Sequence, residues 1–270
     1  MLDVHPPHEA AHTWKDFFLH IATICIGLLI AVGLEQTVEL FHHRHQRHQL
    51  EAELRTESLQ NMNRALRNID AFTALESSTS AQYTEIQAAA HDHRSPHFVR
   101  QEFGPGNDYP ATAAWVVAQQ SATLGLLPVA ESQFYVTLYR ATDRVTSSMA
   151  DEFNIRQSLY AARIPAHLVD AASPKSSQAP AYDLSRMTPD QLRIFSERLA
   201  EDNVSAANCI YRNRAIYLLD WAIWHGYTSE HDRKRLKDAA ANLSEGKAAL
   251  LTRFPLPEEA KHLTNSEGDR

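Results

Sequence analysis

The sequence predicts an all-α protein in which an N-terminal transmembrane helix continues into an antiparallel helical bundle. Residues 17–34 contain no Asp, Glu, Lys or Arg, which is typical of a membrane-spanning helix. The remaining chain is poor in glycine, with 8 glycines among 270 residues, and it is rich in residues that favour helices. Its apolar residues recur at steps of three and four, and no alternating strand pattern of useful length is present.

The apolar run has the length of a bilayer-spanning helix. Eighteen residues span about 27 Å at 1.5 Å per residue, close to the ~30 Å thickness of the hydrocarbon layer. Trp14 and Lys15 precede the run and suit the headgroup layer. A cleaved signal peptide and a buried core helix are the alternatives. The run ends in Gly33-Leu34-Glu35-Gln36, which is a poor cleavage site, so a retained single-pass anchor is favoured.

Small residues line one face of this predicted anchor. Thr23, Gly27 and Ala31 lie four positions apart, and His20 and Glu35 extend the same stripe at its two ends. Small residues at this spacing let two helices approach closely in a membrane. We therefore expect homo-oligomerisation through this face.

The expected location is a cell membrane, specifically a bacterial inner membrane. Lysine and arginine in the flanking segments differ by about one charge between the two sides, which leaves open the side on which the C-terminal domain lies.

Proline, glycine and capping residues divide the rest of the chain. Residues 1–16 form a short flank, 17–40 the transmembrane helix, 41–171 a juxtamembrane helix and bundle, 172–187 a flexible connection, 188–254 a C-terminal helical pair packing on the bundle, and 255–270 a polar tail. Within these segments, helices are expected to about Ala74 and over 80–90, 111–122, 129–163, 188–225 and 229–253, with a loop over 91–110.

A histidine-rich collar follows the span. It consists of His42, His43, Arg44, His45, Arg47 and His48. Imidazoles protonate near pH 6.5, so the collar gains positive charge in mild acid and would then bind anionic headgroups more strongly. A plain basic collar is the simpler interpretation, and a pH- or metal-responsive envelope sensor is the alternative.

Residues 8–12 (HEAAH) match a zinc-peptidase pattern. His8 and His12 would share a Zn²⁺ and Glu9 would activate a water, which describes a membrane-bound zinc-dependent hydrolase. Two prolines stand immediately before His8, and no third ligand follows in a matching position. The pattern is therefore expected to be incidental, with no cofactor and no catalytic residues assigned.

Composition excludes some classes of function. The net charge of −7 and the absence of a concentrated basic surface argue against nucleic-acid binding. Cys25 lies in the apolar run and Cys209 in the polar domain, so a disulfide between them is not expected. Asp220 lies in an aromatic-rich helical stripe, where an arginine such as Arg212 or Arg214, or one on another helix, is expected to balance its charge.

The pattern His5-Pro6-Pro7-His8-Glu9-Ala10, then Trp14 to Phe18, then Gly27 to Gln36, resembles a family of uncharacterised bacterial single-span membrane proteins. The stretch 112–139 also looks like a second block of that family. The resemblance implies an N-terminal anchor, a histidine-rich juxtamembrane helix and a helical domain, and it brings no activity. The leading hypothesis is a non-enzymatic interaction or scaffold module whose partners are the lipid bilayer, a second copy and an unidentified protein.

Overall fold

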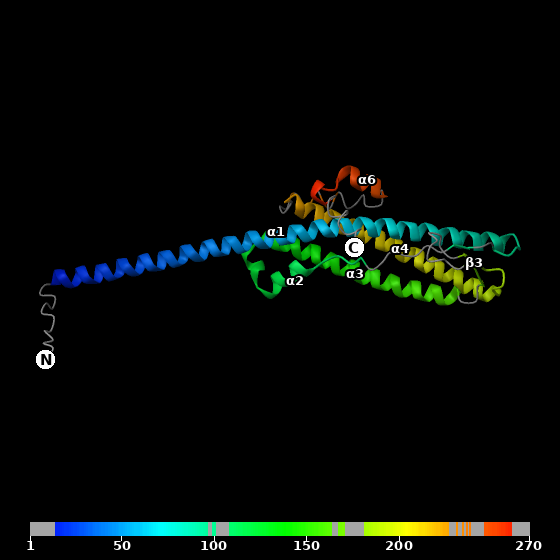
Figure 1. Ribbon diagram of the computed structural model, residues 1–270, viewed down its shortest axis with the longest axis horizontal. Coiled ribbons are helices and arrows are strands. Elements are labelled where there is room, and N and C mark those ends of the chain that lie inside the picture. The colour runs from blue at the N-terminus through cyan, green and yellow to red at the C-terminus, as the bar shows by residue number, and fades with distance from the viewer. Residues whose placement is uncertain are drawn as a thin grey trace, which may run out of the picture. The chain divides into compact units, whose positions relative to one another are not determined.

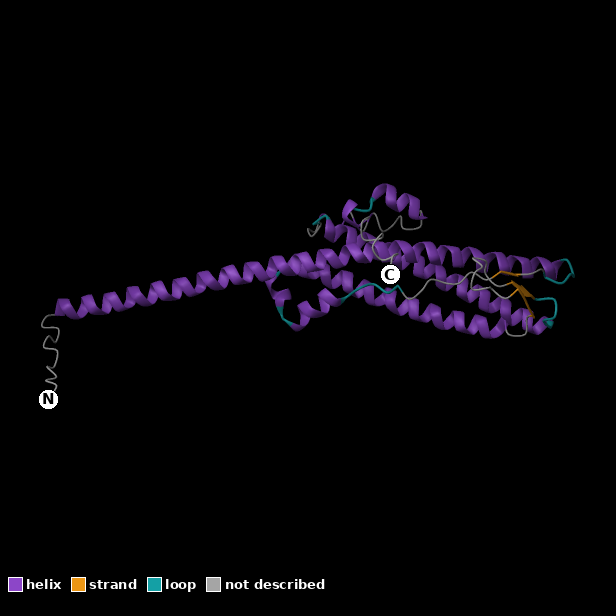
Figure 2. Cartoon of the chain, viewed as in Figure 1, coloured by secondary structure: helices purple, strands orange, loops and turns teal. Residues whose placement is uncertain are grey.

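The computed structural model describes residues 14–96, 99–100, 108–163, 167–170, 181–226, 231, 234, 236, 238 and 246–260. The described chain is predominantly helical, which confirms the all-α class (Figures 1 and 2). It divides into two compact units, residues 1–50 and 51–270. In chain order the elements are α1 (Trp14–His91), β1 (Val99–Arg100), α2 (Ala113–Gln120), the 3₁₀ helix η1 (Thr123–Leu126), α3 (Val129–Arg163), β2 (His167–Asp170), β3 (Ala181–Asp183), α4 (Pro189–Trp224) and α6 (Gly246–Arg253).

Helix α1 is one uninterrupted helix, so the break expected between residues 74 and 80 is absent. Serine and threonine in this stretch do not divert the backbone. The hydroxyl of Thr79 donates to the carbonyl of Leu75 at 3.0 Å, within the preceding turn. The helix ends where His93 adopts a left-handed φ of 50° and the Arg94 N–H donates to the carbonyl of Ala89 at 3.0 Å.

In the second unit, α3 runs in the same direction as α1. Tyr139 near the start of α3 donates to Glu57 of α1, and Met149 further along α3 accepts from the Asn68 amide at 3.8 Å. Residues later in α1 thus contact residues later in α3. The two helices are therefore parallel, and Tyr139, the eleventh residue of α3, lies beside Glu57, 34 positions before the end of α1.

Helix α4 runs antiparallel to both, as a bundle predicts. Its start contacts the end of α1, where the Gln87 amide donates to the Ser196 hydroxyl at 3.2 Å. Its later part contacts the middle of α1, where the Asn68 amide donates to Asn213 Oδ1 at 3.1 Å. The colour gradient in Figure 1 follows the same opposed direction.

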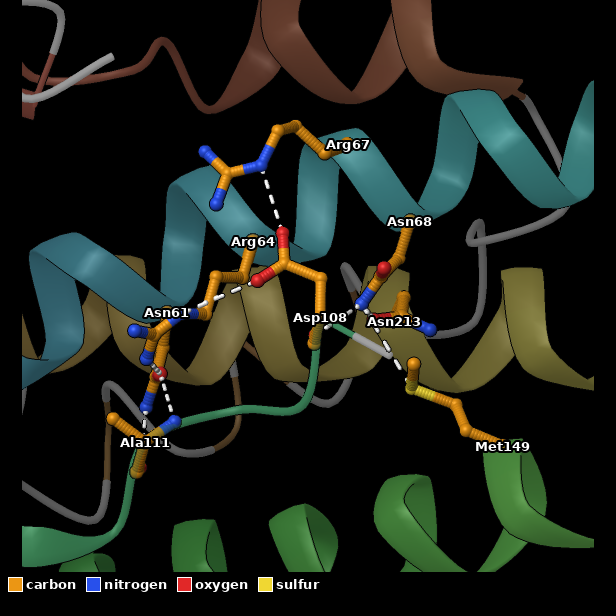
Figure 3. A network of polar contacts seen from close by, with 8 residues as sticks. All are labelled: Asn61, Arg64, Arg67, Asn68, Asp108, Ala111, Met149 and Asn213. Atoms are coloured by element: carbon orange, nitrogen blue, oxygen red, sulfur yellow. Dashed lines mark hydrogen bonds and ion pairs between the residues drawn. The ribbon is translucent and has the colours of Figure 1, made fainter. Parts of the chain in front are cut away.

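An extended segment, residues 108–112, returns along α1 before α2 begins (Figure 3). The Asn68 amide donates to the carbonyl of Asp108 at 3.0 Å. Seven positions earlier on α1, Asn61 accepts from the N–H of Ala111 at 2.7 Å and donates to its carbonyl at 3.0 Å. The Asp108 carboxylate also binds Arg67 Nε at 2.8 Å. Side-chain amides of α1 thereby satisfy backbone groups of a segment that has no strand partner.

Helix boundaries marked by proline and capping residues are confirmed. Helix α3 spans the expected residues 129–163. At the start of α4, the Gln191 N–H donates to Thr188 Oγ1 at 3.3 Å, and the Thr188 N–H donates to Gln191 Oε1 at 2.8 Å. These two bonds form the predicted capping box. Gly226, with φ of 69°, follows the end of α4.

The region expected to be a flexible connection, residues 172–187, is ordered over its last part. Strand β3 pairs antiparallel with β1 and with β2, in a small sheet of order β1-β3-β2 that the sequence did not predict. Just after it, Leu184 and Met187 are buried in an apolar cluster with Ile86, Leu159, Phe195 and Leu199. Their burial ties this part of the chain to the bundle.

The C-terminal segment up to residue 260 is also packed, although residues 255–270 were expected to form a polar tail. The Tyr217 hydroxyl donates to the carbonyl of Phe254 at 2.8 Å, and Trp221 Nε1 donates to that of Pro255 at 2.9 Å. The Asn63 amide of α1 donates to the carbonyl of Ala260 at 2.8 Å. Of the helix expected over 229–253, the structure describes the last part as α6, whose first residue, Gly246, has a left-handed φ of 86°.

Candidate functional site

The main candidate site in the first unit is the apolar surface of α1. Among the described residues, α1 is the one helix long and apolar enough to cross a membrane, with a mean hydropathy of 2.5 in its most apolar window. None of that window is buried within the chain, and Leu29, for example, is 69% exposed. A helix of this composition therefore presents its apolar side chains entirely to its surroundings.

Polar groups within this surface are satisfied by the helix itself. His20 Nδ1 lies 2.8 Å from the carbonyl oxygen of Asp16, and the Thr23 hydroxyl donates to the carbonyl of Leu19 at 2.9 Å. Such local bonds are what a helix needs in an apolar solvent, where no water is present to bind polar groups.

The predicted oligomerisation face lies on this exposed part of α1. All its members, His20, Thr23, Gly27, Ala31 and Glu35, are exposed. A Cβ atom added at Gly27 would meet nothing within 4 Å, so the backbone there is open to a close neighbour. The pairing of two such helices stays a prediction.

The histidine collar lies on α1, where its side chains are exposed apart from the half-buried Arg47: His42, His43, Arg44, His45, Arg47 and His48. His43 Nε2 is 4.0 Å from Glu39 Oε1, and the rings of His42 and His43 have centroids 6.5 Å apart. Because Glu39 stands one turn before His43, an acid lies next to the collar on its N-terminal side. A response of the collar to pH or metal stays a prediction.

The HEAAH residues His8, Glu9 and His12 lie outside the described part of the chain. Among the described residues, no three His, Cys, Asp or Glu side chains are grouped so that they could hold a metal ion. Cys25, which is exposed, and Cys209, which is buried, are both free in the structure. Cys209 is buried and donates to the carbonyl of Ser148 at 3.5 Å, and burial raises its pKa to about 12, so its thiol is inert.

The second unit contains a buried acid, Glu57 of α1, that pattern analysis did not identify. Glu57 accepts from the Tyr139 hydroxyl and, at 2.8 Å, from the Ala114 N–H. The Tyr139 ring stacks on Trp115 with centroids 4.6 Å apart. Glu57 is thus held between three elements, α1, α2 and α3.

Asp220 of α4 lies near Glu57. The arginine partner expected for it is absent among the described residues. Its carboxylate is fully buried, and neither oxygen accepts a hydrogen bond from the described residues. Burial raises its pKa well above the usual value, the Ser58 hydroxyl opposes the rise, and the charge of Glu57 adds to it. The Ser58 hydroxyl is near enough to act electrostatically, although its geometry is not that of a hydrogen bond. Arg212 instead donates to Asn208 and to the backbone of Arg144.

A second buried acid, Asp202, lies further along α4. Its two oxygens have no hydrogen-bond partner among the described residues, and the side chain is fully buried. Its pKa is raised to about 7: burial is the main cause, the charge of the nearby Glu152 adds to the rise, and Arg156 opposes it. Arg156 is committed to Glu152, to which its Nε donates at 2.8 Å. Asp202 is therefore neutral over part of the physiological pH range.

A groove of about 580 Å³ lies between the end of α1 and the start of α4. Its lining is largely apolar and includes Tyr83, Ile86, Ala90 and Leu192. Arg94, at its edge, is bound to both oxygens of Glu85 at 2.7 and 3.1 Å. The groove is therefore a largely apolar concave surface, and the charge of Arg94 in its lining is balanced by Glu85.

Comparison with protein-family models, with curated protein sequences and with solved structures gives no match. The class of protein is accordingly defined by its own fold: a helical bundle unit, and a unit whose helix is long and apolar enough to span a bilayer.

Proposed function

We propose that the protein is a single-pass membrane protein whose helical bundle serves as a non-enzymatic interaction module in an oligomer. The observation that carries this proposal is the exposure of the apolar part of α1, of which no portion is covered by the rest of the chain. Lipid is the occupant that this surface fits best.

The distribution of the exposed side chains supports lipid over a single protein partner. Leu28, Leu29 and Ile30 are consecutive and all exposed, so they project in three directions about 100° apart. A partner packed on one face would leave the other faces in water, whereas lipid surrounds a helix on every side.

The energetics point the same way. Residues 17–34 include eleven exposed large apolar side chains: Phe17, Phe18, Leu19, Ile21, Ile24, Ile26, Leu28, Leu29, Ile30, Val32 and Leu34. At about 1.5 kcal/mol each, moving them out of water contributes on the order of 15 kcal/mol. That equals or exceeds the whole folding free energy of an ordinary domain, about 5–15 kcal/mol.

Membrane extraction tests the anchor. The full-length chain should remain in the membrane pellet after an alkaline carbonate wash, and the double variant Leu28→Arg with Leu29→Arg should move to the supernatant. The matched control, Leu28→Ala with Leu29→Ala, should stay in the pellet because it adds no charge. Intact parent protein in the supernatant would refute the anchor.

Oligomerisation is tested on the small-residue face. In a membrane reporter of helix association, Gly27→Leu with Ala31→Leu should lower the dimer signal because bulk on this face separates the backbones. Leu29→Ile, on the opposite face, should leave the signal unchanged. An undiminished signal in the double variant would remove this interface. Crosslinking from native membranes would then identify the protein partner of the bundle.

A zinc-dependent hydrolase remains the alternative from another class. Stoichiometric zinc in untagged protein, lost in His12→Ala, would favour that function over the interaction module.

A further inference from the structure

A second pocket, of about 440 Å³, opens between α3 and α4. Its walls combine apolar and basic groups: Ala141, Arg144 and Val145 come from α3, and Asn208, Tyr211, Arg212 and Ala215 come from α4. The residues that carry its chemistry are 68 positions apart in the chain, so only the packing of α3 on α4 brings them together.

The two arginines of this pocket have no carboxylate partner in the described part of the chain. Six other arginines of the described chain do bind an Asp or Glu: Arg64, Arg67, Arg94, Arg156, Arg193 and Arg198. The chain as a whole carries a net charge of −7. Two arginines that line one pocket without an acid therefore form a local concentration of uncompensated positive charge.

Arg212 is held in place by uncharged acceptors. Its Nε donates to Asn208 Oδ1 at 3.1 Å, and its Nη1 donates to the carbonyl of Arg144 at 3.3 Å. These two bonds use two of the five N–H groups of the guanidinium and fix its plane. The remaining donors are available to a ligand, and a guanidinium oriented in advance loses less conformational entropy when it binds.

We propose that this pocket binds a small phosphate monoester, with the phosphate between Arg144 and Arg212. Two guanidinium groups match a doubly charged phosphate in charge, and each can donate two parallel hydrogen bonds to its oxygens. The Tyr211 hydroxyl and the Asn208 amide add further polar groups at the same rim.

The size and floor of the pocket favour an esterified phosphate over the inorganic ion. A volume of about 440 Å³ lies in the range of small-molecule sites and leaves room beyond one phosphate group. Ala141, Val145 and Ala215 supply the apolar part of the lining, here called the apolar floor, and Tyr211, which is 54% exposed, adds an aromatic ring. A ligand with a flat apolar body beside its phosphate would cover this floor. The proposal involves the second unit alone and does not depend on membrane anchoring.

Calorimetric titration of the detergent-solubilised full chain with phenyl phosphate tests the site, with inorganic phosphate and benzoate as comparison probes. We expect one phenyl phosphate per chain, weaker binding of inorganic phosphate, and weaker binding of benzoate, which carries a single charge. Equal affinity for phenyl phosphate and inorganic phosphate would contradict the role of the apolar floor. No binding of either phosphate probe at millimolar concentration would overturn the site.

Variants separate this site from general charge attraction. Arg144→Gln and Arg212→Gln should each weaken phenyl phosphate binding about tenfold or more, because each removes charge-assisted hydrogen bonds. The matched control is Arg140→Gln, an exposed arginine one turn earlier on α3 that does not line the pocket. It should bind as the parent does. Arg212→Lys keeps the charge and should still bind less tightly, since lysine lacks the planar fork. An equal loss in Arg140→Gln, or none in Arg144→Gln and Arg212→Gln, would refute the proposal.

Discussion

Replacing Asp202 by asparagine should stabilise the protein at alkaline pH and much less in mild acid. Asp202 is fully buried, its oxygens accept no hydrogen bond from the described residues, and its pKa is raised from 3.8 to about 7. Between these two values the folded chain holds a proton that the unfolded chain has released. Stability therefore falls as pH rises through this window and levels off above about pH 7.

The size of the effect follows from the same two values. At about 1.4 kcal/mol for each pKa unit, the charged carboxylate costs the folded state about 4 kcal/mol at pH 8. At pH 5 the group is largely protonated in the folded chain, and between about 1 and 2 kcal/mol of that cost remains. The advantage of Asp202→Asn should thus shrink by about 2–3 kcal/mol from pH 8 to pH 5. Burying the asparagine amide adds a cost of its own, which is the same at both pH values and cancels in this difference.

Urea unfolding of the full-length chain in detergent, followed by tryptophan fluorescence at pH 5 and pH 8, measures this difference. Urea is preferred because guanidinium chloride would screen the charges of Glu152 and Arg156, which face Asp202 from α3. Asp143→Asn on the exposed side of α3 is the matched control and should give no pH-dependent gain. An advantage of Asp202→Asn that is equal at the two pH values would refute the argument.

Three further substitutions test the packing of the second unit by the same unfolding assay. Tyr139→Phe removes one of the two donors that serve the buried Glu57 and should cost about 1–3 kcal/mol; a neutral result would mean that water replaces the hydroxyl. Thr188→Ala removes the N-cap bond to the Gln191 N–H and should cost about 1 kcal/mol, so an unchanged midpoint would contradict the capping box. Leu54→Ala empties a fully buried site and should cost about 2–5 kcal/mol, and a loss below 1 kcal/mol would show that the site collapses or is accessible to water.

Features encoded by local chemistry were predictable from the sequence. Pro128 and Pro165 bracket α3, and the Thr188 capping box fixes the start of α4, because proline and cap residues act on their immediate neighbours. The apolar run of α1 was also predictable, since its length and composition alone make it long and apolar enough to cross a membrane.

Features that depend on partners far away in the chain could not be predicted from the sequence. The helix was expected to end near Ala74 and a second one to start at residue 80, yet α1 is continuous there, and the Thr79 hydroxyl donates to the carbonyl of Leu75 in the preceding turn. Leu184 and Met187 are isolated apolar residues in a polar stretch, and only the neighbouring helices make them part of the core. The pocket that Arg144 and Arg212 line could not be predicted either, because only the packing of α3 on α4 brings these arginines together.

The error at Asp220 has a simple geometric cause. Arg212 and Arg214 precede it by eight and six positions on α4, whereas helical side chains meet at three or four. Proximity in sequence was mistaken for proximity on the helix surface. The acid faces Ser58 and Glu57 of α1 instead, where no base is available among the described residues.

The buried polar contacts of the bundle determine how its helices align along one another. The two N–H groups of the Asn68 amide in α1 are shared among three acceptors, Asn213 Oδ1 of α4, Met149 Sδ of α3 and the Asp108 carbonyl, so four segments meet at one side chain (Figure 3). A shift of any segment by one helical turn, 5.4 Å, would leave several of these groups buried without a partner, at about 1–3 kcal/mol each. Apolar side chains alone would tolerate such a shift far better, because dispersion contacts are not directional. We therefore attribute the register of α1, α3 and α4 to these amides, and the stability of the bundle to the apolar core around them.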